Sequence, residues 1–500
     1  MAFLDFEDYP KDKCGIVVAY SYSEKNVIPQ IYNGMMALQH RGQDGYGACT
    51  FDGLSFHKKK GRGLVPGPDE FLDLSGRLGI GHVRYTTAGE SPLSIPSNES
   101  IEDFVQPVED NSVRHGIRLG FNGNIINFIE LKDLFRHEAY ITSETDAGVI
   151  VRILANELSK KKNLNESITK AMEMLDGAYS VVAITGLNEM IAFMDPLGVR
   201  PLCYGSNDEL EMIASESVAL DVNHIKNYRM VEPGELIVIN PGMNPKEKID
   251  PNILVRSERH AHCMFERVYI ARPDSTLEGG EVYGIRKELG RKLAKRYPTN
   301  AEVIVPVPDT ARPGASGISE VTGIPDEEGL IKNRYVPRTF IMPKQASREN
   351  SVDIKLNPVK GVIRGKRVVI VDDSLVRGTT MRKIVNKVKE AGATYIEVWL
   401  TCPPPISPCY YGINMKTHEE LAAANHSLEE IRIGIGADKL NYQTVEDLVE
   451  ALGLPKEELC LGCLTGKYPT PSAQRLADEG KMKLKKEIVL ESRLSEKNIS

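Results

Sequence analysis

The sequence predicts an α/β protein of at least two domains, and three observations support this fold class. The 500 residues are too many for a single hydrophobic core. Short runs of β-branched residues alternate with segments of helical periodicity, which is typical of α/β architecture. The segment 241–251 contains prolines, a glycine and charged residues without periodicity, as exposed linkers do. We therefore predict a domain boundary in this segment.

The first predicted domain covers residues 14–240 and is rich in short strands. Apolar runs at 15–19 and 236–239 stand among glycine-rich connections, and few helices are evident between them. This composition predicts a layered unit in which β-sheet outweighs helix.

The second predicted domain covers residues 255–470 and has a more regular order of elements. We expect a helix over 282–296, followed by strands at 303–307, 368–371 and 395–400. The strand at 368–371 is β-branched without alternation, which is typical of a parallel strand buried on both faces. A parallel sheet is therefore expected in this domain.

Charge and cysteine content favour a cytoplasmic enzyme of small metabolites. The net charge of −7 provides no basic surface, which argues against nucleic acid or an anionic membrane as partner. Residues 1–13 are acidic and lack a signal pattern, and no apolar run of about 18 residues occurs. In a reducing compartment the eight cysteines favour metal binding or catalysis over disulfides. The charged tail 471–500 is expected to be a solvated helix rather than a binding tail.

The strand at 368–371 leads into two adjacent carboxylates, Asp372 and Asp373, and then into a small-residue turn before a helix. The carboxylates offer hard oxygen ligands for ribose hydroxyls or Mg²⁺, and a helix start offers backbone N–H groups to a phosphate. The alternative is an ordinary turn with solvated aspartates. The loop residues expected to hold the phosphate are Arg377, Gly378, Thr379 and Thr380.

The order of these residues, with Ser374 between the acids and Arg-Gly-Thr-Thr, resembles the fingerprint of type I phosphoribosyltransferases. The resemblance implies that the acid pair holds the ribose of phosphoribosyl pyrophosphate and that the loop binds its 5′-phosphate. It also implies a Mg²⁺ ion contacted by Thr310, Asp372 and Asp373.

Cys14 begins an apolar run, so by itself it reads as a buried strand cysteine. A series of motifs downstream changes this interpretation, because together they resemble class II glutamine amidotransferases. The motifs are Leu38-Gln-His-Arg-Gly-Gln-Asp-Gly45, Gly81-His-Val-Arg-Tyr-Thr-Thr-Ala-Gly89, Phe121-Asn-Gly-Asn124, Thr145-Asp146 and Asp195-Pro-Leu-Gly-Val-Arg-Pro201.

In that family the cysteine is the first residue of the mature enzyme, and its own α-amino group is the general base. The ordinary pKa is about 7.7 to 8.0 for the amine and about 8.5 for the thiol, so the amine can take the thiol proton near neutrality at little cost in free energy. Residues 1–13 should therefore be a propeptide, since an amide nitrogen is not basic. By resemblance, Arg84 binds the glutamine carboxylate and Asp146 binds its ammonium group. Asn122 and the backbone N–H of Gly123 form the oxyanion hole, although Asn-Gly alone commonly marks a turn.

A glutaminase half beside a phosphoribosyl half is similar to the amidophosphoribosyltransferase family. This resemblance implies an N-terminal-nucleophile hydrolase fold, followed by a type I phosphoribosyltransferase fold. It implies that ammonia from glutamine attacks ribose C1 of phosphoribosyl pyrophosphate, with Tyr269 lining the ammonia path. Homo-oligomers and feedback inhibition by purine nucleotides are further expectations from the family.

Four cysteines of the second half form a candidate metal centre. Cys460-Leu-Gly-Cys463 needs two more thiolates, which Cys263 and Cys409 could supply, and the spacing does not distinguish Zn²⁺ from a [4Fe–4S] cluster. The resemblance favours the cluster in a structural role. Cys402 is an alternative ligand, and otherwise it is expected to pack as a small hydrophobe, as are Cys49 and Cys203.

Two rival functions are weighed against this interpretation. A hexosamine-phosphate synthase would share the glutaminase half but not the acid pair at Asp372 and Asp373. A phosphoribosyl-pyrophosphate-binding regulator with an inactive glutaminase would be expected to lack the nucleophile or its anion clamp, yet Cys14 and Arg84 are both present.

Overall fold

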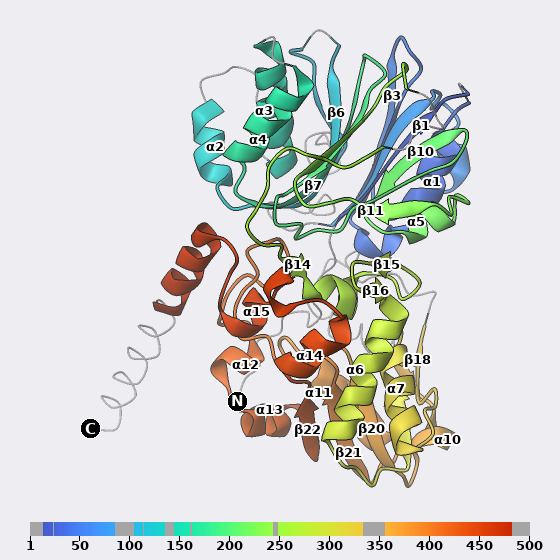
Figure 1. Ribbon diagram of the computed structural model, residues 1–500. Helices are drawn as coiled ribbons and strands as arrows, with labels where there is room; N and C mark the ends of the chain where they lie inside the picture. Colours follow the sequence, from blue (N-terminus) through green and yellow to red (C-terminus); the bar gives the residue numbers. More distant parts are fainter. Residues whose placement is uncertain are drawn as a thin grey trace.

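The computed structural model describes residues 14–23, 25–85, 105–113, 115–135, 145–160, 163–243, 249–333 and 356–482. Figure 1 shows two bodies, with the first half of the chain above the second. The predicted propeptide 1–13 and the end of the charged tail lie outside the described residues, whereas 471–482 is helical.

The first half is built on two antiparallel sheets that pack face to face. The seven-stranded sheet has the order β11 (Tyr228–Met230), β9 (Cys203–Ser206), β10 (Leu210–Ala214), β1 (Gly15–Ser21), β4 (Leu78–Arg84), β2 (Gly45–Phe51) and β3 (Phe56–Arg62). The six-stranded sheet has the order β13 (Asn252–Ile253), β12 (Glu235–Ile239), β8 (Met190–Met194), β7 (Gly177–Thr185), β6 (Ile117–Ile125) and β5 (Val108–Asp110).

Helices cover the outer faces of both sheets, which gives four layers. Helices α1 (Ile28–Ala37) and α5 (Val218–Asp221) pack on the seven-stranded sheet. Helices α3 (Asp146–Ser159) and α4 (Leu164–Met174) pack on the six-stranded sheet beside α2 (Phe128–Phe135). Between the sheets lies a separate core of fully buried side chains from both, which explains why β1 and β7 read as continuous apolar runs. The predicted layered unit is confirmed.

The second half contains a parallel sheet in the order β17 (Val303–Pro306), β20 (Arg367–Asp372), β21 (Tyr395–Leu400) and β22 (Lys439–Tyr442). Its larger helices are α6 (Val282–Arg296), α7 (Arg312–Thr322), α11 (Thr379–Glu390), α13 (Leu428–Ile435) and α14 (Val445–Leu452). The predicted helix and strands lie where the structure has α6, β17, β20 and β21. The acid pair therefore stands at the carboxyl end of a central strand.

Several short elements connect and complete the two halves. They are β14 (His262–Cys263), β15 (Thr276–Leu277), β16 (Gly280–Glu281), β18 (Leu330–Lys332), β19 (Leu356–Pro358), α10 (Lys360–Ile363), α12 (Ala422–Asn425), β23 (Leu459–Cys460) and α15 (Gly462–Thr465). Strand β13 lies just beyond the segment predicted as a linker and pairs with β12.

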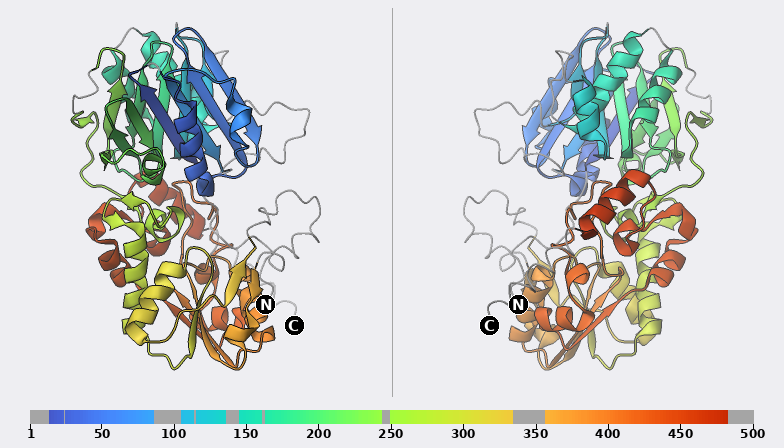
Figure 2. Two further views of the ribbon diagram at one scale, coloured as in Figure 1. Left: turned by 90° about the vertical axis from the view of Figure 1, so that its right-hand side faces the viewer. Right: turned by 90° about the vertical axis from the view of Figure 1, so that its left-hand side faces the viewer.

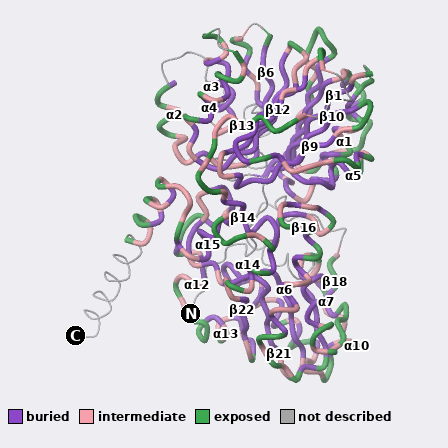
Figure 3. Tube along the Cα trace, viewed as in Figure 1, coloured by how far each residue is buried: buried purple, intermediate pink, exposed green. Residues whose placement is uncertain are grey.

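The two halves share a hydrophobic core at their junction. Ala178 and Val199 of the first half belong to the same buried cluster as Phe265 and Tyr411 of the second. Figure 2 shows the two halves meeting from two further sides, and Figure 3 shows buried chain around β14 and α15 where they meet. None of the helices in the described ranges is long and apolar enough to cross a membrane. The cytoplasmic location stays a prediction.

Candidate active sites

Cys14 lies at the junction of the halves, directly before β1, and is buried. Its Sγ contacts the carbonyl oxygen of Tyr85 at 3.5 Å, and its own carbonyl accepts a hydrogen bond from Nε of Arg41 at 3.2 Å. The next strand residues are held by Ser215, whose Oγ accepts from the N–H of Ile16 at 3.1 Å. The main chain around the thiol is thus fixed on both sides.

Arg84 ends β4 next to this thiol and is 5% exposed. Burial lowers the pKa of the Arg84 guanidinium, and the charges of Cys14, Asp44 and Asp146 oppose that shift. Asp146 begins α3, and its Oδ2 accepts from the N–H of Ile125 at the end of β6. The sequence-predicted Arg84 and Asp146 therefore act electrostatically on one another beside the thiol.

Asn122 and Gly123 lie in β6, three and two residues before Ile125, whose N–H donates to Asp146. The Asn122 side chain is fully buried, and neither of its polar atoms has a hydrogen-bond partner within the described part of the chain. A buried amide without partners is costly in a folded protein, so it points to a ligand that the amide would bind. A Cβ at Gly123 would lie 1.9 Å from the carbonyl oxygen of Ala178, so the close approach of β7 requires glycine here.

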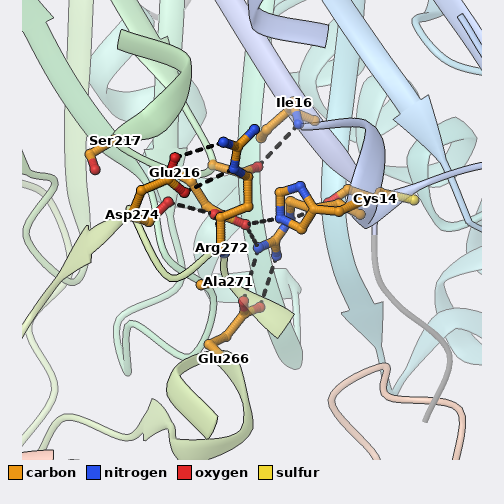
Figure 4. Close-up of polar contacts among 12 residues, drawn as sticks. Cys14, Ile16, Glu216, Ser217, Glu266, Ala271, Arg272 and Asp274 are labelled. Carbon is orange, nitrogen blue, oxygen red and sulfur yellow. Dashed lines mark hydrogen bonds and ion pairs between the residues drawn. The ribbon is translucent and has the colours of Figure 1, made fainter. Parts of the chain in front are cut away.

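A buried group of charges behind Cys14 was not predicted from the sequence (Figure 4). Arg41 donates from Nη1 and Nη2 to the two carboxylate oxygens of Glu266 at 3.0 and 2.9 Å, and from Nη1 to Glu216 at 2.5 Å. Arg200 donates to Glu266 Oε1 at 2.7 Å, and His40 Nε2 lies 2.7 Å from Glu216. Arg41 stands inside the motif 38–45 that the sequence singles out, but nothing in the sequence joins it to Glu216 or Glu266, which lie far along the chain.

The second candidate site lies at the carboxyl end of β20. Asp372 and Asp373 are almost fully buried, the N–H of Asp373 donates to Asp372 Oδ1 at 2.9 Å, and Ser374 Oγ donates to Asp373 Oδ1 at 2.7 Å. Thr310, between β17 and α7, donates from Oγ1 to Asp373 Oδ2. Two carboxylates and a hydroxyl form an all-oxygen set of the kind that Mg²⁺ prefers.

The loop after the acid pair has the backbone that a phosphate site needs. Gly378 has φ +84° and directly precedes α11, so the N–H groups of Thr379 and Thr380 belong to the first turn of a twelve-residue helix. The Arg377 side chain pairs with Glu420, with Nε at 3.0 Å from Oε2. Arg377 can therefore serve this loop through its main chain while its guanidinium is held by Glu420.

The four cysteines expected to bind metal converge next to the junction. Cys263 and Cys460 are register partners in the parallel pair β14 and β23, and the carbonyl of Cys463 accepts from the N–H groups of Ile406 and Ser407, just before Cys409 in the chain. Burial raises the pKa of Cys460 to about 12, and the charges of Cys263 and Cys409 act in the same direction. The pKa of Cys463 is raised by burial and by all three of the other thiols.

No three His, Cys, Asp or Glu side chains in the described ranges are arranged to hold a metal ion. Zn²⁺ and a [4Fe–4S] cluster, the two alternatives left open by the spacing, both stay predictions. Cys402 is fully buried near Cys263 and Asp373, whereas Cys49 and Cys203 pack in the cores of the first half, as predicted.

Tyr269 lies in a turn that contacts residues near each candidate site. It follows Glu266 in the turn Glu266–Ile270, and its ring lies 5.9 Å from that of Phe265 between centroids. Arg286 of α6 donates to the carbonyls of Arg267 and Ala271 in and after this turn, and its charge interacts with both Asp373 and Tyr269. The turn therefore connects the surroundings of the two sites.

Comparisons with known proteins agree with this division into two sites. A glutamine amidotransferase domain model matches residues 93–222, and a phosphoribosyl transferase domain model matches residues 279–407. The chain is 44% identical over 470 residues to the amidophosphoribosyltransferase of Methanothermobacter thermautotrophicus, covering 93% of this chain and 96% of that protein. It is 42% identical to that of Bacillus subtilis over 469 residues, which covers 92% and 94% of the two chains.

Two solved structures are similar to this chain over almost its whole length. The glutamine phosphoribosylpyrophosphate amidotransferase from B. subtilis, complexed with ADP and GMP, superposes with a TM-score of 0.81 at 40% identity. This match covers 92% of the present chain and 98% of the other. A second structure, described as the allosteric regulatory enzyme of purine biosynthesis, also gives a TM-score of 0.81 at 40% identity and covers 91% and 96%.

Proposed function

The chain belongs to the amidophosphoribosyltransferase family, and from this premise we propose how its residues divide the reaction between two sites. The protein is an enzyme of purine biosynthesis that transfers ammonia from glutamine to C1 of phosphoribosyl pyrophosphate, giving 5-phosphoribosylamine, glutamate and pyrophosphate. The alternative, a regulator with an inactive glutaminase, is not favoured by near full-length similarity to relatives named for this activity. We assign 14–240 to the glutaminase domain, 255–470 to the phosphoribosyltransferase domain, and 1–13 and 471–500 to a propeptide and a charged tail.

Cys14 is the proposed nucleophile of glutamine hydrolysis. Its thiol attacks the side-chain carboxamide of glutamine, and its α-amino group, freed by removal of residues 1–13, takes the thiol proton and passes it to the leaving ammonia. The single observation that carries this proposal is the buried, unpartnered Asn122 amide in the strand next to Asp146 and Arg84. The amide of Asn122 and the N–H of Gly123 would stabilise the oxyanion of the tetrahedral intermediate.

Arg84 and Asp146 are proposed to hold the two charged ends of the glutamine backbone. A guanidinium fork matches a carboxylate in two-point geometry, and a carboxylate matches an ammonium group. The burial of Arg84 supports the proposal, because a buried guanidinium is destabilised without an opposite charge and the glutamine carboxylate would supply that charge.

Asp372 and Asp373 are proposed to bind the ribose hydroxyls of phosphoribosyl pyrophosphate, and residues 377–380 to hold its 5′-phosphate through their N–H groups. Mg²⁺, when bound at Thr310, Asp372 and Asp373, would neutralise the pyrophosphate leaving group as the C1–O bond breaks. The hydrogen bond between Thr310 and Asp373 supports this set of oxygen donors.

Ammonia must pass between the sites without reaching water, because protonated ammonia is not a nucleophile. We propose that Tyr269 lines this path, on the ground that its turn contacts both the glutaminase network and the helix beside Asp373. The shared buried core at the junction would exclude solvent there.

We further propose that Cys263, Cys409, Cys460 and Cys463 hold a [4Fe–4S] cluster of structural role. The electrostatic interaction of Cys463 with the other three thiols supports it, and Cys263, Cys460 and Cys463 are buried. When bound, the cluster would cross-link β14, β23 and the segment after Cys409. Because a solved relative is complexed with ADP and GMP, we also propose inhibition by purine nucleotides. A homo-oligomer stays an expectation from the family resemblance.

The first test is intact mass and amino-terminal sequencing of anaerobically purified protein, combined with an assay of glutamate release. A chain beginning at Cys14, with native mass added for four iron and four sulfide and with glutamate release that depends on phosphoribosyl pyrophosphate, is expected. A chain that begins at Cys14 and releases no glutamate would overturn the proposed nucleophile, and a chain that still begins at Met1 yet releases glutamate would overturn the α-amino group as its base. A native mass without the iron and sulfide would overturn the cluster.

A further inference from the structure

The proposed nucleophile of the first half, Cys14, is linked through Arg41 to a carboxylate of the second half, that of Glu266. We propose that Glu266 is a positioning residue for glutamine hydrolysis, which acts by fixing Arg41 and through it the main-chain carbonyl of Cys14. The inference rests on the proposed role of Cys14. It assigns to Glu266 a part in the reaction of the other half of the chain.

The geometry of Arg41 leaves it no freedom in this position. Its Nε donates to the Cys14 carbonyl at 3.2 Å, while Nη1 and Nη2 bind both oxygens of Glu266 in a two-point pair. Arg41, Glu266 and Glu216 are all fully buried, so water cannot replace any of these contacts. A guanidinium is planar, so fixing its two terminal nitrogens also fixes the direction in which Nε points.

Charge balance within the network depends on Glu266. The guanidinium groups of Arg41 and Arg200 face the carboxylates of Glu266 and Glu216, which makes two buried cations and two buried anions. Burial alone would raise the pKa of Glu266, but the charges of Arg41 and Arg200 outweigh it, and the pKa lies below its ordinary value. Neutralising Glu266 would remove the carboxylate that faces both guanidinium groups, which is strongly unfavourable unless a guanidinium is displaced.

Glu266 is itself anchored in the second half. It begins the turn Glu266–Ile270, and Arg200, which it binds, donates from Nη2 to the carbonyl of Tyr411 at 2.9 Å. The other acid, Glu216, accepts from the N–H of Arg272 and from Ser275 Oγ, both beyond the turn. The position of Arg41 is thus set by the second half, although the carbonyl that it holds belongs to the first.

The held carbonyl belongs to the residue whose thiol and α-amino group both react. Holding it fixes the orientation of the Cys14 Cα, and with it the direction from which Sγ approaches the carboxamide of a glutamine whose charged ends are bound by Arg84 and Asp146. Loss of such orientation by about 1 Å costs about a hundredfold in rate, while the groups that bind the substrate are unchanged. The expected signature is a fall in kcat without a matching rise in KM.

The test compares Glu266→Gln with Glu235→Gln in the full-length, processed enzyme. Glu235 is also fully buried and binds Arg229 in a two-point pair at 2.6 and 2.8 Å, and Arg229 donates to the carbonyl of Met230 where Arg41 donates to that of Cys14, so it is a matched control. For Glu266→Gln we expect kcat for glutamine hydrolysis to fall about ten- to a hundredfold and KM for glutamine to change less than about threefold. Ammonia-dependent release of pyrophosphate should stay within about twofold, and the control should stay near wild type in both assays.

Equal loss in both assays, a rise in KM alone, or an equal loss in the control would overturn the inference. If Glu266→Gln is recovered only unfolded, Arg41→Lys provides the second variant, since an ammonium group cannot reach the Cys14 carbonyl and both Glu266 oxygens together. A folded Arg41→Lys enzyme with wild-type kcat would overturn the inference as well. Wild-type protein without glutaminase activity would overturn both the proposed nucleophile and this inference. Wild-type kcat for glutamine hydrolysis in Glu266→Gln would overturn the inference alone.

Discussion

Replacing Gly123 by alanine should disable glutamine hydrolysis and leave the phosphoribosyl site intact. The new Cβ would lie 1.9 Å from the carbonyl oxygen of Ala178, far inside the 3.0 Å below which real Cβ contacts do not occur. Strands β6 and β7 must therefore separate by about 1 Å at the proposed oxyanion hole. A misplacement of this size, or loss of one oxyanion donor, lowers kcat about a hundredfold or more, which corresponds to about 2.7 kcal/mol of transition-state stabilisation.

The assay is steady-state glutamate release at saturating phosphoribosyl pyrophosphate, alongside ammonia-dependent pyrophosphate release. Gly186→Ala is the control, because its Cβ would meet the His115 carbonyl oxygen at 2.1 Å at the opposite end of the same strand pair. Both variants should lose about 1 to 3 kcal/mol of stability through overpacking. If Gly123→Ala keeps its kcat, or if Gly186→Ala loses as much, the oxyanion assignment is wrong.

Four further outcomes are expected. Cys14→Ser should lower glutamine-dependent product formation at least about a thousandfold and leave ammonia-dependent formation within about twofold, as measured by product chromatography. Asp373→Asn should lower ammonia-dependent pyrophosphate release about a hundredfold, with a weaker response to added Mg²⁺. Cys263→Ser should contain less than half of the wild-type iron after anaerobic purification, and unchanged iron would remove Cys263 from the ligand set. Burial, aided by the charge of Arg84, lowers the pKa of His82 to about 3, so the folded protein keeps this imidazole neutral. The stabilisation from burying the neutral ring is therefore complete above the ordinary pKa of 6.5 and is lost as the pH falls. At pH 5 this loss is about 2 kcal/mol, and denaturant titrations of His82→Gln should show a flatter pH dependence.

The sequence predicted best the helices that bury one face and the short strands that are buried on both faces. Helix α6 keeps an apolar stripe through Ile285, Leu289 and Leu293, so its bounds could be read directly. Helix α3 was missed because its residues from Ala147 to Ala155 are all buried, which removes the polar face that marks an amphipathic helix.

The candidate sites were predictable where a motif is local and not where partners are distant. Asp372 and Asp373 follow their strand directly, and Asn122 and Gly123 lie within one strand. Arg41 and Glu266, however, are of charged types that are mostly exposed in proteins, and they become partners only because the junction buries them 225 positions apart. The pairing of Arg377 with Glu420 has the same origin, since the motif predicts only the main-chain role of the loop.

The segment that carries Cys402 and Cys409 contacts residues of both reaction sites. The cysteine group of Cys263, Cys409, Cys460 and Cys463 is therefore expected to stabilise both sites through this segment. The N–H of Cys402 donates to the carbonyl of Asp373 at 2.8 Å, whereas the carbonyls of Tyr410 and Tyr411 accept from Asn124 at 3.0 Å and from Arg200. Asn124 directly follows the oxyanion residues in β6. Because one segment holds parts of both sites, disrupting the cysteine group should lower glutaminase and ammonia-dependent transfer together. Glu266→Gln and Gly123→Ala should lower the first alone, so the ratio of the two rates separates the segment's role from the positioning of Cys14.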